Sequence, residues 1–337
     1  MTKIGLTTTV PIEILLAAGR IPVDLNNLFV TSDEPNRYIE LAERDGFPKS
    51  MCAWIKGIYG ACIENGITEV VGVTEGDCTN TKCLLDIFEL KGIKLYDFGF
   101  PHGRDAHRLE HSIMTLQSQF GVTTEAVEAI RLSLAPLREL SSQIDALTVT
   151  TGQAGGFENH LYQVAMSDLG GVGIEKFHQT LEDAYKEMLK RPVNTKGLRL
   201  AYLGVPPMTG DLYDYIETLD AMVVYNEVQN EFAFPRASLA LSINEQYLDY
   251  TYPYDNKTRI ESIREQLSLR RIDGIIHYTQ AFCHRAIDDI LIKHHLDIPV
   301  LHIEGDTSTV LDARTKLRIE AYLDMLHDKK EGVTCEF

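Results

Sequence analysis

Residues 272–306 have the sequence IDGIIHYTQAFCHRAIDDILIKHHLDIPVLHIEGD, and they predict one strand–helix–strand unit. The apolar runs at 272–279 and 298–306 are typical of buried strands, and residues 284–295 between them have a helical pattern. Two strands joined through a helix pair in parallel, which indicates an α/β fold. Cys283 lies where the first strand ends and the helix begins, and this position raises the question whether its thiol is a core residue or a ligand.

The same alternation occurs in two separate parts of the chain. Strands are expected at 3–10, 21–25, 68–75 and 93–100, and again at 198–206, 221–228, 272–279 and 298–306. Residues 104–189 have a helical pattern instead, with one long helix, kinked at Pro136, expected at 123–147. We therefore predict an N-terminal α/β lobe at 1–150, a helical connecting segment at 151–196 and a C-terminal α/β lobe at 197–337.

Composition limits the classes of function. The chain has 337 residues and a net charge of -17, so its average field repels phosphates and disfavours nucleic acid or an anionic membrane as a partner. No apolar run approaches the roughly 20 residues that span a bilayer. We expect a cytoplasmic protein, in which cysteines stay reduced and serve as ligands, nucleophiles or core residues.

Three of the six cysteines share one kind of position. Cys78 and Cys283 each follow a predicted strand and open a helix, and Cys52 lies near the start of a helix expected from Pro48. Asp77 is the expected N-cap beside Cys78. Ligands bind beyond the carboxyl ends of parallel strands, and a helix N-terminus favours the thiolate form. The spacing contains no C-x-x-C pair, so buried core thiols remain the alternative on the residues alone.

Two histidines form a second candidate site. His107 and His111 are four residues apart on one predicted helix face, with His102 nearby, and such a pair can bind zinc. The sequence provides no third ligand and no H-E-x-x-H order, so a solvated helix face is the favoured interpretation.

Several motifs together resemble one known family. They are TTVPIEILLAAGRIPVDL at 8–25, GFPKSMCAWIK at 46–56, VVGVTEGDC at 70–78, and the C-terminal DGIIHYTQAFCHRAIDD, IPVLHIEGD and LRIEAYLDML. Over nearly its whole length the chain is similar to the 2-hydroxyacyl-CoA dehydratases, which include the 2-hydroxyglutaryl-CoA dehydratase D-component and are related to benzoyl-CoA reductase.

The resemblance implies a site. It implies two flavodoxin-like lobes with a [4Fe-4S] cluster in the cleft between them, bound by Cys52, Cys78 and Cys283. Three thiolates would leave one iron of the cubane open, because such clusters usually have four cysteine ligands. The resemblance also makes Thr8, Thr9 and Glu13 candidates for lining the active site.

The resemblance also implies an activity and partners. The activity is a one-electron dehydration of a 2-hydroxyacyl-CoA or similar thioester through a ketyl radical, in an oxygen-sensitive lyase. The electron would come from a separate ATP-hydrolysing iron–sulfur activator, and the chain would form a homodimer or a heterodimer with a related subunit. Arg314 or Arg318 could meet a phosphate of CoA, although a core helix is the favoured interpretation of their segment.

Two other functions stay open. Some relatives carry a double-cubane [8Fe-9S] cluster and reduce small molecules, and Cys62 and Cys83 are extra thiols near Cys52 and Cys78. Cys78 and Cys83 are about 140° apart around a helix, which disfavours their binding one cluster. Such a chain could also be an electron-transfer subunit. The third hypothesis is a two-lobed protein that binds a small molecule without a cluster.

Overall fold

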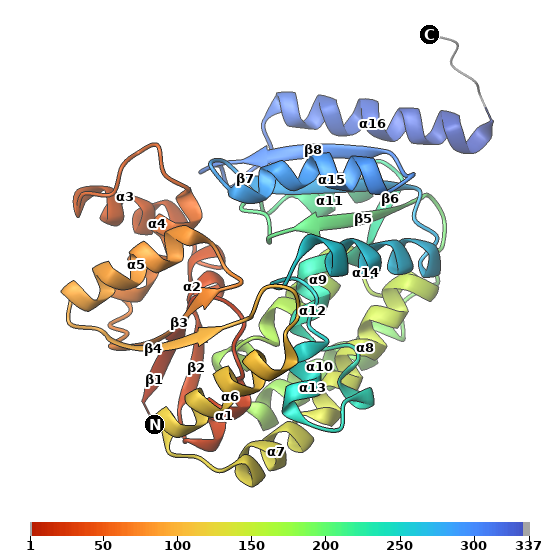
Figure 1. Cartoon of the computed structure of the whole chain (residues 1–337). Coiled ribbons are helices and arrows are strands. Elements are labelled where there is room, and N and C mark those ends of the chain that lie inside the picture. The colour runs from red at the N-terminus through yellow and green to blue at the C-terminus, as the bar shows by residue number, and fades with distance from the viewer. Residues whose placement is uncertain (1, 333–337) are drawn as a thin grey trace.

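Two separate four-stranded sheets organise the chain, and every strand pair in them is parallel. The computed structural model describes residues 2–332, and Figure 1 shows the two sheets in two lobes. The strand orders are β2-β1-β3-β4 and β6-β5-β7-β8. The strands are β1 Lys3–Leu6, β2 Ile21–Asp24, β3 Glu69–Glu75, β4 Lys94–Gly99, β5 Leu198–Gly204, β6 Ala221–Asn226, β7 Gly274–Gln280 and β8 Val300–Gly305.

Helices make up most of the remaining chain. In the first sheet's part they are α1 Ile12–Ala17, α2 Leu25–Val30, α3 Pro35–Arg44, α4 Ala53–Glu64 and α5 Thr79–Leu90. Between the sheets they are α6 Ala106–Phe120, α7 Thr124–Ser133, α8 Ala135–Thr150, α9 Gly156–Ala165, η1 Leu169–Gly171 and α10 Ile174–Met188. In the second sheet's part they are α11 Leu212–Glu217, α12 Glu227–Phe232, η2 Ala237–Leu239, α13 Ile243–Leu248, α14 Asn256–Leu269, η3 His284–Ile287, α15 Asp288–His295 and α16 Ala313–Glu331.

The two sheets have the same topology. In each sheet, the second strand along the chain pairs with one side of the first strand, and the third strand pairs with the other side of that first strand. This order, with helices between the strands, is flavodoxin-like, so the predicted α/β fold with two flavodoxin-like lobes is confirmed. The order of the strands reverses between β1 and β3 in one sheet and between β5 and β7 in the other, and ligands bind at such positions.

The structure corrects several predicted helices. The helix expected from Pro48 begins at Ala53, and the long helix expected at 123–147 is two helices that meet at Leu134. Proline at 136 occupies the first turn of the second helix, where its missing N–H costs nothing. The sequence analysis also missed α2, α12 and α13, which have only six residues each.

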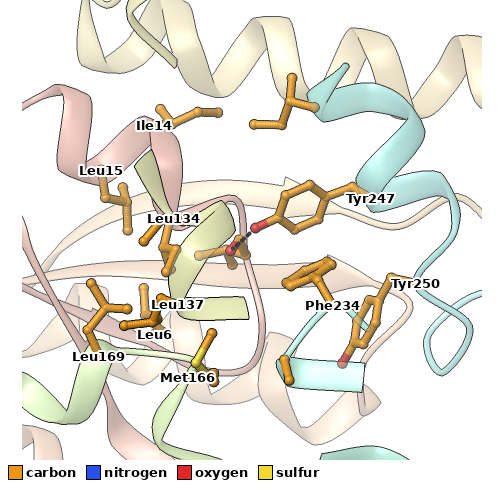
Figure 2. Packing of buried hydrophobic residues seen from close by; sticks show 14 of the residues in the cluster. Leu6, Ile14, Leu15, Leu134, Leu137, Met166, Leu169, Phe234, Tyr247 and Tyr250 are labelled. Atoms are coloured by element: carbon orange, nitrogen blue, oxygen red, sulfur yellow. Dashed lines mark hydrogen bonds between the residues drawn. The ribbon is translucent and has the colours of Figure 1, made fainter. Parts of the chain in front are cut away.

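One hydrophobic core joins segments that are far apart in the sequence. Leu6 from β1 and Ile14 and Leu15 from α1 share a buried cluster with Phe234 and Tyr247, which follow the second sheet's β6 (Figure 2). Residues between β6 and α14 therefore pack into the same hydrophobic core as β1 and α1 of the first lobe. This packing fixes the orientation of the two lobes, because separating them would expose these aromatic rings to water. Among residues 2–332, no helix is long and apolar enough to cross a membrane.

Candidate functional site

A cavity of about 110 Å³ lies between the two lobes. Its wall includes Thr8 after β1, Asp24 at the end of β2 and Val205 after β5, so both sheets contribute their carboxyl ends. This is the edge at which parallel α/β sheets bind ligands, because the loops there are free to vary while the strands hold them in place. Cys52, Cys78 and Cys283 all line this one cavity.

Each of the three cysteines is the N-cap of a helix. Cys52 caps α4, Cys78 caps α5, and Cys283 caps the 3-10 helix η3. The sulfur of Cys78 accepts the backbone N–H of Asn80 at 3.4 Å. Cys78 itself, and not Asp77, is therefore the cap of α5. A cap position directs free backbone N–H groups at the side chain and so stabilises negative charge on sulfur.

The turn before Cys78 requires glycine. Gly76 has a φ of +89°, and a Cβ atom at that position would lie 2.7 Å from Cβ of Phe100 and 3.1 Å from the carbonyl oxygen of Pro253. Only glycine adopts this positive-φ backbone conformation readily. Its missing side chain also leaves room for Phe100 and for Pro253 of the second lobe. The turn therefore lets the two lobes approach each other closely beside the thiol.

The turn before Cys283 is strained in a similar way. Phe282 has a φ of +63°, which is uncommon for a residue with a side chain, and 63% of its surface is exposed. The backbone N–H of Cys283 donates to the carbonyl oxygen of Gln280 at 2.9 Å. The β7 strand thus ends in a tight turn that places both Cys283 and the largely exposed Phe282 at the cavity wall.

The three thiols influence one another electrostatically. Burial raises the pKa of Cys52, Cys78 and Cys283, and the backbone N–H groups at the three helix starts partly oppose that rise. Repulsion from Cys78 also raises the pKa of Cys52, and repulsion from Cys283 raises that of Cys78. Three buried thiolates are therefore unfavourable unless positive charge is bound between them, and a metal centre supplies such charge.

The three thiols do not form a compact site for a single metal ion. Within residues 2–332, no group of three or more histidine, cysteine, aspartate or glutamate side chains is arranged around one metal ion. The cysteines instead surround a cavity from three helix starts. An iron–sulfur cubane binds each thiolate at a different iron, so three thiols around one cavity are compatible with such a cluster.

The other cysteines lie elsewhere. Cys62 is buried inside α4, its sulfur faces the carbonyl oxygen of Ile67 at 3.8 Å, and burial raises its pKa to about 12. Cys83 is exposed on α5, and neither residue lines the cavity. Cys335 lies outside the described residues.

Thr8, Thr9 and Glu13 do not share one environment. Thr8 lines the cavity, whereas Thr9 accepts a hydrogen bond from Tyr250 at 3.3 Å in the adjoining core. Glu13 is fully buried outside the cavity wall, where it accepts hydrogen bonds from Gln246 and Tyr247, each at 2.8 Å. Of the three predicted site residues, only Thr8 therefore reaches the cavity.

Glu13 also forms a buried ion pair with Arg138 at 2.5 Å. Burial by itself would raise the pKa of Glu13, but Arg138 and the hydrogen bond from Gln246 hold that pKa below its usual value. This carboxylate joins α1 to α8 and α13.

Sequence analysis missed a buried chain of charges that ends at the cavity. Arg259 donates to both carboxylate oxygens of Glu227 at 2.6 and 2.9 Å, and to Asp288 at 2.8 Å. Asp288 also accepts from Arg285 at 3.2 Å, and Arg285 lies over the ring of Tyr252 and lines the cavity. In the sequence, the one sign of this set of ion pairs is that Arg285 and Asp288 are three residues apart, which places them on the same helical turn.

The remaining candidates lie away from the cavity. His107 on α6 has 94% of its side chain exposed, and His102 and His111 are exposed as well, which agrees with a solvated helix face. Arg318 donates to the carbonyl oxygen of His302 at 2.6 Å, and neither it nor Arg314 lines the cavity.

Comparison with known proteins identifies a family. A family model described as 2-hydroxyglutaryl-CoA dehydratase, D-component, matches residues 7–326, which include every strand except β1 and the three cysteines of the cavity. A search of curated proteins found no significant match to the chain.

Proposed function

Because this chain belongs to the 2-hydroxyglutaryl-CoA dehydratase D-component family, we propose that it is an iron–sulfur component of a 2-hydroxyacyl-CoA dehydratase. The proposed cofactor is one [4Fe-4S] cluster bound by Cys52, Cys78 and Cys283. The observation that carries the proposal is that three thiols, from segments up to 231 positions apart, all cap helices around one cavity between the lobes. Structural thiols have no physical reason to gather in this way.

When bound, the cluster would supply one electron to the substrate and take it back after the elimination. The chain's own residues would position the thioester and respond to its charge. Arg285 would stabilise negative charge that develops on the thioester oxygen, since it lines the cavity and is held rigidly by Asp288 and Tyr252. The apolar wall formed by residues such as Val228 and Phe232 would exclude water from a reactive radical.

The proposed partners follow from the same chemistry. Dehydration by electron transfer needs a strong one-electron donor, and we propose an ATP-hydrolysing iron–sulfur activator for this role. We also propose that the chain works as a dimer, either with itself or with a related subunit. The proposed substrate is a 2-hydroxyacyl-CoA.

Anaerobic purification followed by iron and sulfide analysis tests the cofactor. We expect four irons and four sulfides per chain, as in one cubane, and a reduced sample should give an EPR signal. Replacing Cys52, Cys78 or Cys283 by Ala should remove the iron. Cys83→Ala is the matched control, because Cys83 lies on the same helix as Cys78 but is exposed and away from the cavity.

The activity assay follows formation of the 2-enoyl-CoA after addition of activator, ATP and a 2-hydroxyacyl-CoA. We expect turnover that disappears with each of the three cavity cysteines and remains in Cys83→Ala. Iron loss in Cys62→Ala or Cys83→Ala would contradict a three-cysteine cluster and would favour a larger cluster with a reductase or electron-transfer role. An iron-free wild-type protein purified without oxygen would rule the proposal out.

A further inference from the structure

The charges of the cavity wall determine which acyl group the cavity can hold. Among the lining residues in 2–332, the basic side chains are His284 and Arg285. Arg285 lies 3.2 Å from the carboxylate of Asp288 and over the ring of Tyr252, and it is the group proposed for the thioester oxygen. His284 is exposed to solvent, where a charge pair contributes little. A second carboxylate inside the cavity would therefore meet no unpaired cation of the described wall.

Two carboxyl groups in the wall also act against a negatively charged ligand. Asp24 at the end of β2 and Asp77 just before α5 both line the cavity. Either one, when ionised, repels a carboxylate nearby, and a carboxylate that is buried without a cation loses the water that stabilised its charge. A dicarboxylic acyl group such as glutaryl is therefore disfavoured, although the family model that matches the chain is described by such a group.

Apolar side chains from both lobes favour a different acyl group. Ile55 and Ile58 lie one turn apart on α4, and Val228 and Phe232 lie one turn apart on α12. All four residues line the cavity, and the first three are at most 5% exposed. An acyl chain that ends in a methyl group would bury apolar surface against these side chains without any loss of charge hydration.

Phe232 lies between this cavity and a second, smaller one. The second cavity has a volume of about 10 Å³, and Phe232 lines both cavities. The wall of the second cavity includes Leu134, Met166 and Leu169, which Figure 2 shows in the hydrophobic core. The space beyond Phe232 is thus apolar, and this side chain closes the larger cavity toward it.

Ion pairs fix both ends of the helix that carries Phe232. Glu227 at the start of α12 pairs with Arg259 at 2.6 Å, and Glu231 near its end pairs with Arg236 at 2.7 Å. The side chains of Glu227, Arg259 and Glu231 are each 2% exposed. These buried pairs hold a helix of only six residues in place, so Phe232 has the fixed position that a specificity-determining residue requires.

We propose that the cavity selects a 2-hydroxyacyl-CoA with an apolar acyl side chain, and that Phe232 sets the maximum length of that side chain. This inference rests on the proposed function, because it places the acyl group of the proposed substrate in the cavity. Selection against a charged acyl group arises from the charge that the wall cannot neutralise. The length limit arises from the side chain that closes the cavity toward the smaller one.

Calorimetric binding of two thioesters tests the acyl class. Pentanoyl-CoA and glutaryl-CoA have acyl chains of equal length and differ at the last carbon, which is a methyl group in one and a carboxylate in the other. Neither has a 2-hydroxyl group, so neither is dehydrated during the measurement. We expect the anaerobically purified protein to bind pentanoyl-CoA at least about 100-fold more tightly, because burying an unpaired charge costs far more than a methyl group gains. Equal affinities, tighter binding of glutaryl-CoA or binding of neither thioester overturns the apolar class.

Replacement of Phe232 tests the length limit. We expect wild-type protein to prefer pentanoyl-CoA to octanoyl-CoA, and Phe232→Ala to shift this ratio of affinities toward octanoyl-CoA by at least about tenfold, the low end of the value of one methylene group in a pocket. Phe232→Leu should shift it in the same direction by less, and it keeps a branched apolar side chain if the alanine variant does not fold. Phe157→Ala is the matched control, because Phe157 lines neither cavity and is 39% exposed. An unchanged ratio in the folded Phe232 variants overturns the length limit.

Failure of the proposed function gives a different result from failure of this inference. A protein without iron, or without formation of 2-enoyl-CoA, refutes the proposed function, whereas the binding comparison still measures the acyl class. Tighter binding of glutaryl-CoA to an iron-loaded, active protein refutes the acyl class alone. In the active holoenzyme, we expect 2-hydroxypentanoyl-CoA to be dehydrated with a higher kcat/KM than 2-hydroxyglutaryl-CoA, and the reverse order overturns the inference.

Discussion

Replacing Glu13 by Gln separates a structural role from a catalytic one. Its carboxylate is fully buried and pairs with Arg138, while Gln246 and Tyr247 complete its hydrogen bonds. The family resemblance made Glu13 a candidate for lining the active site, but the structure places it where α1, α8 and α13 meet. We therefore expect Glu13→Gln to lower stability and to leave the turnover of folded protein unchanged.

The magnitude follows from what the substitution leaves behind. Glu13→Gln removes the carboxylate that pairs with Arg138, whose side chain is 6% exposed. Arg138 keeps a hydrogen bond to Gln246 at 2.8 Å and its contact with the ring of Phe234, but its charge becomes unpaired. Breaking a buried ion pair in this way costs about 3–5 kcal/mol of the free energy of unfolding. In the double variant Glu13→Gln/Arg138→Met, we expect the loss to be about 1–3 kcal/mol smaller than the sum of the two single losses.

Urea unfolding followed by fluorescence measures these differences. Trp54 is the only tryptophan of the chain and lies buried in the first lobe, so its emission reports on that lobe. The pH dependence gives a second readout. Arg138 lowers the pKa of Glu13 in the folded protein, so the pair stabilises the fold above the unfolded pKa of about 4.3. That stabilisation is lost as the pH falls through the lower folded pKa, and Glu13→Gln should lack this loss.

Two results would refute the reasoning about Glu13. One is a change in the free energy of unfolding below about 1 kcal/mol, which would mean that the ion pair contributes little. The other is a fully folded, iron-loaded Glu13→Gln protein without turnover. That result would make Glu13 part of the catalytic machinery, as the family resemblance implied.

Two further substitutions test how the cavity is built. Gly76→Ala should cost about 1–3 kcal/mol of stability from backbone strain and should also lower iron content, because the new methyl group meets Phe100. Gly92→Ala has a similar strained backbone but open space, so it should keep its iron; equal iron in both variants would contradict the role of the close approach. Arg259→Met leaves Glu227 buried and unpaired, and it should lower the free energy of unfolding by about 3–5 kcal/mol in urea titrations. A loss below about 1 kcal/mol would show that Glu227 finds another partner.

The sequence predicts the sheets and the helix starts that carry the thiols. Strand–helix alternation is local, because each buried strand and each helix face has its own pattern of apolar residues. The positions of Cys78 and Cys283 after strands follow directly from that pattern. The start of α4 was predicted too early, since residues 48–51 form a turn in which Met51 donates to the carbonyl oxygen of Pro48. A turn next to a helix has no periodicity that distinguishes it from the helix.

The polar parts of the molecule could not be predicted, because their partners are distant in the sequence. Gln246 meets Glu13 across 233 positions, and Asp24 meets Asp168 across 144. The helix α13 that brings Gln246 to Glu13 has only six residues. Helices this short depend on tertiary contacts for their stability, so their own sequence says little about them.

The repeated topology explains why the cavity has three thiols and not four. The two sheets have the same strand order, so β3 corresponds to β7, and Cys78 and Cys283 follow corresponding strands. Cys52 caps α4, the last helix before β3, and the corresponding helix before β7 is α14. The cap of α14 is Asp255, whose carboxylate accepts the backbone N–H of Thr258 at 2.7 Å. The duplicated fold thus has four corresponding cap positions; the fourth residue, Asp255, caps its own helix and does not line the cavity. A cluster bound by the other three would keep one position free of protein thiolates, which is the arrangement that separates catalytic metal centres from closed structural ones.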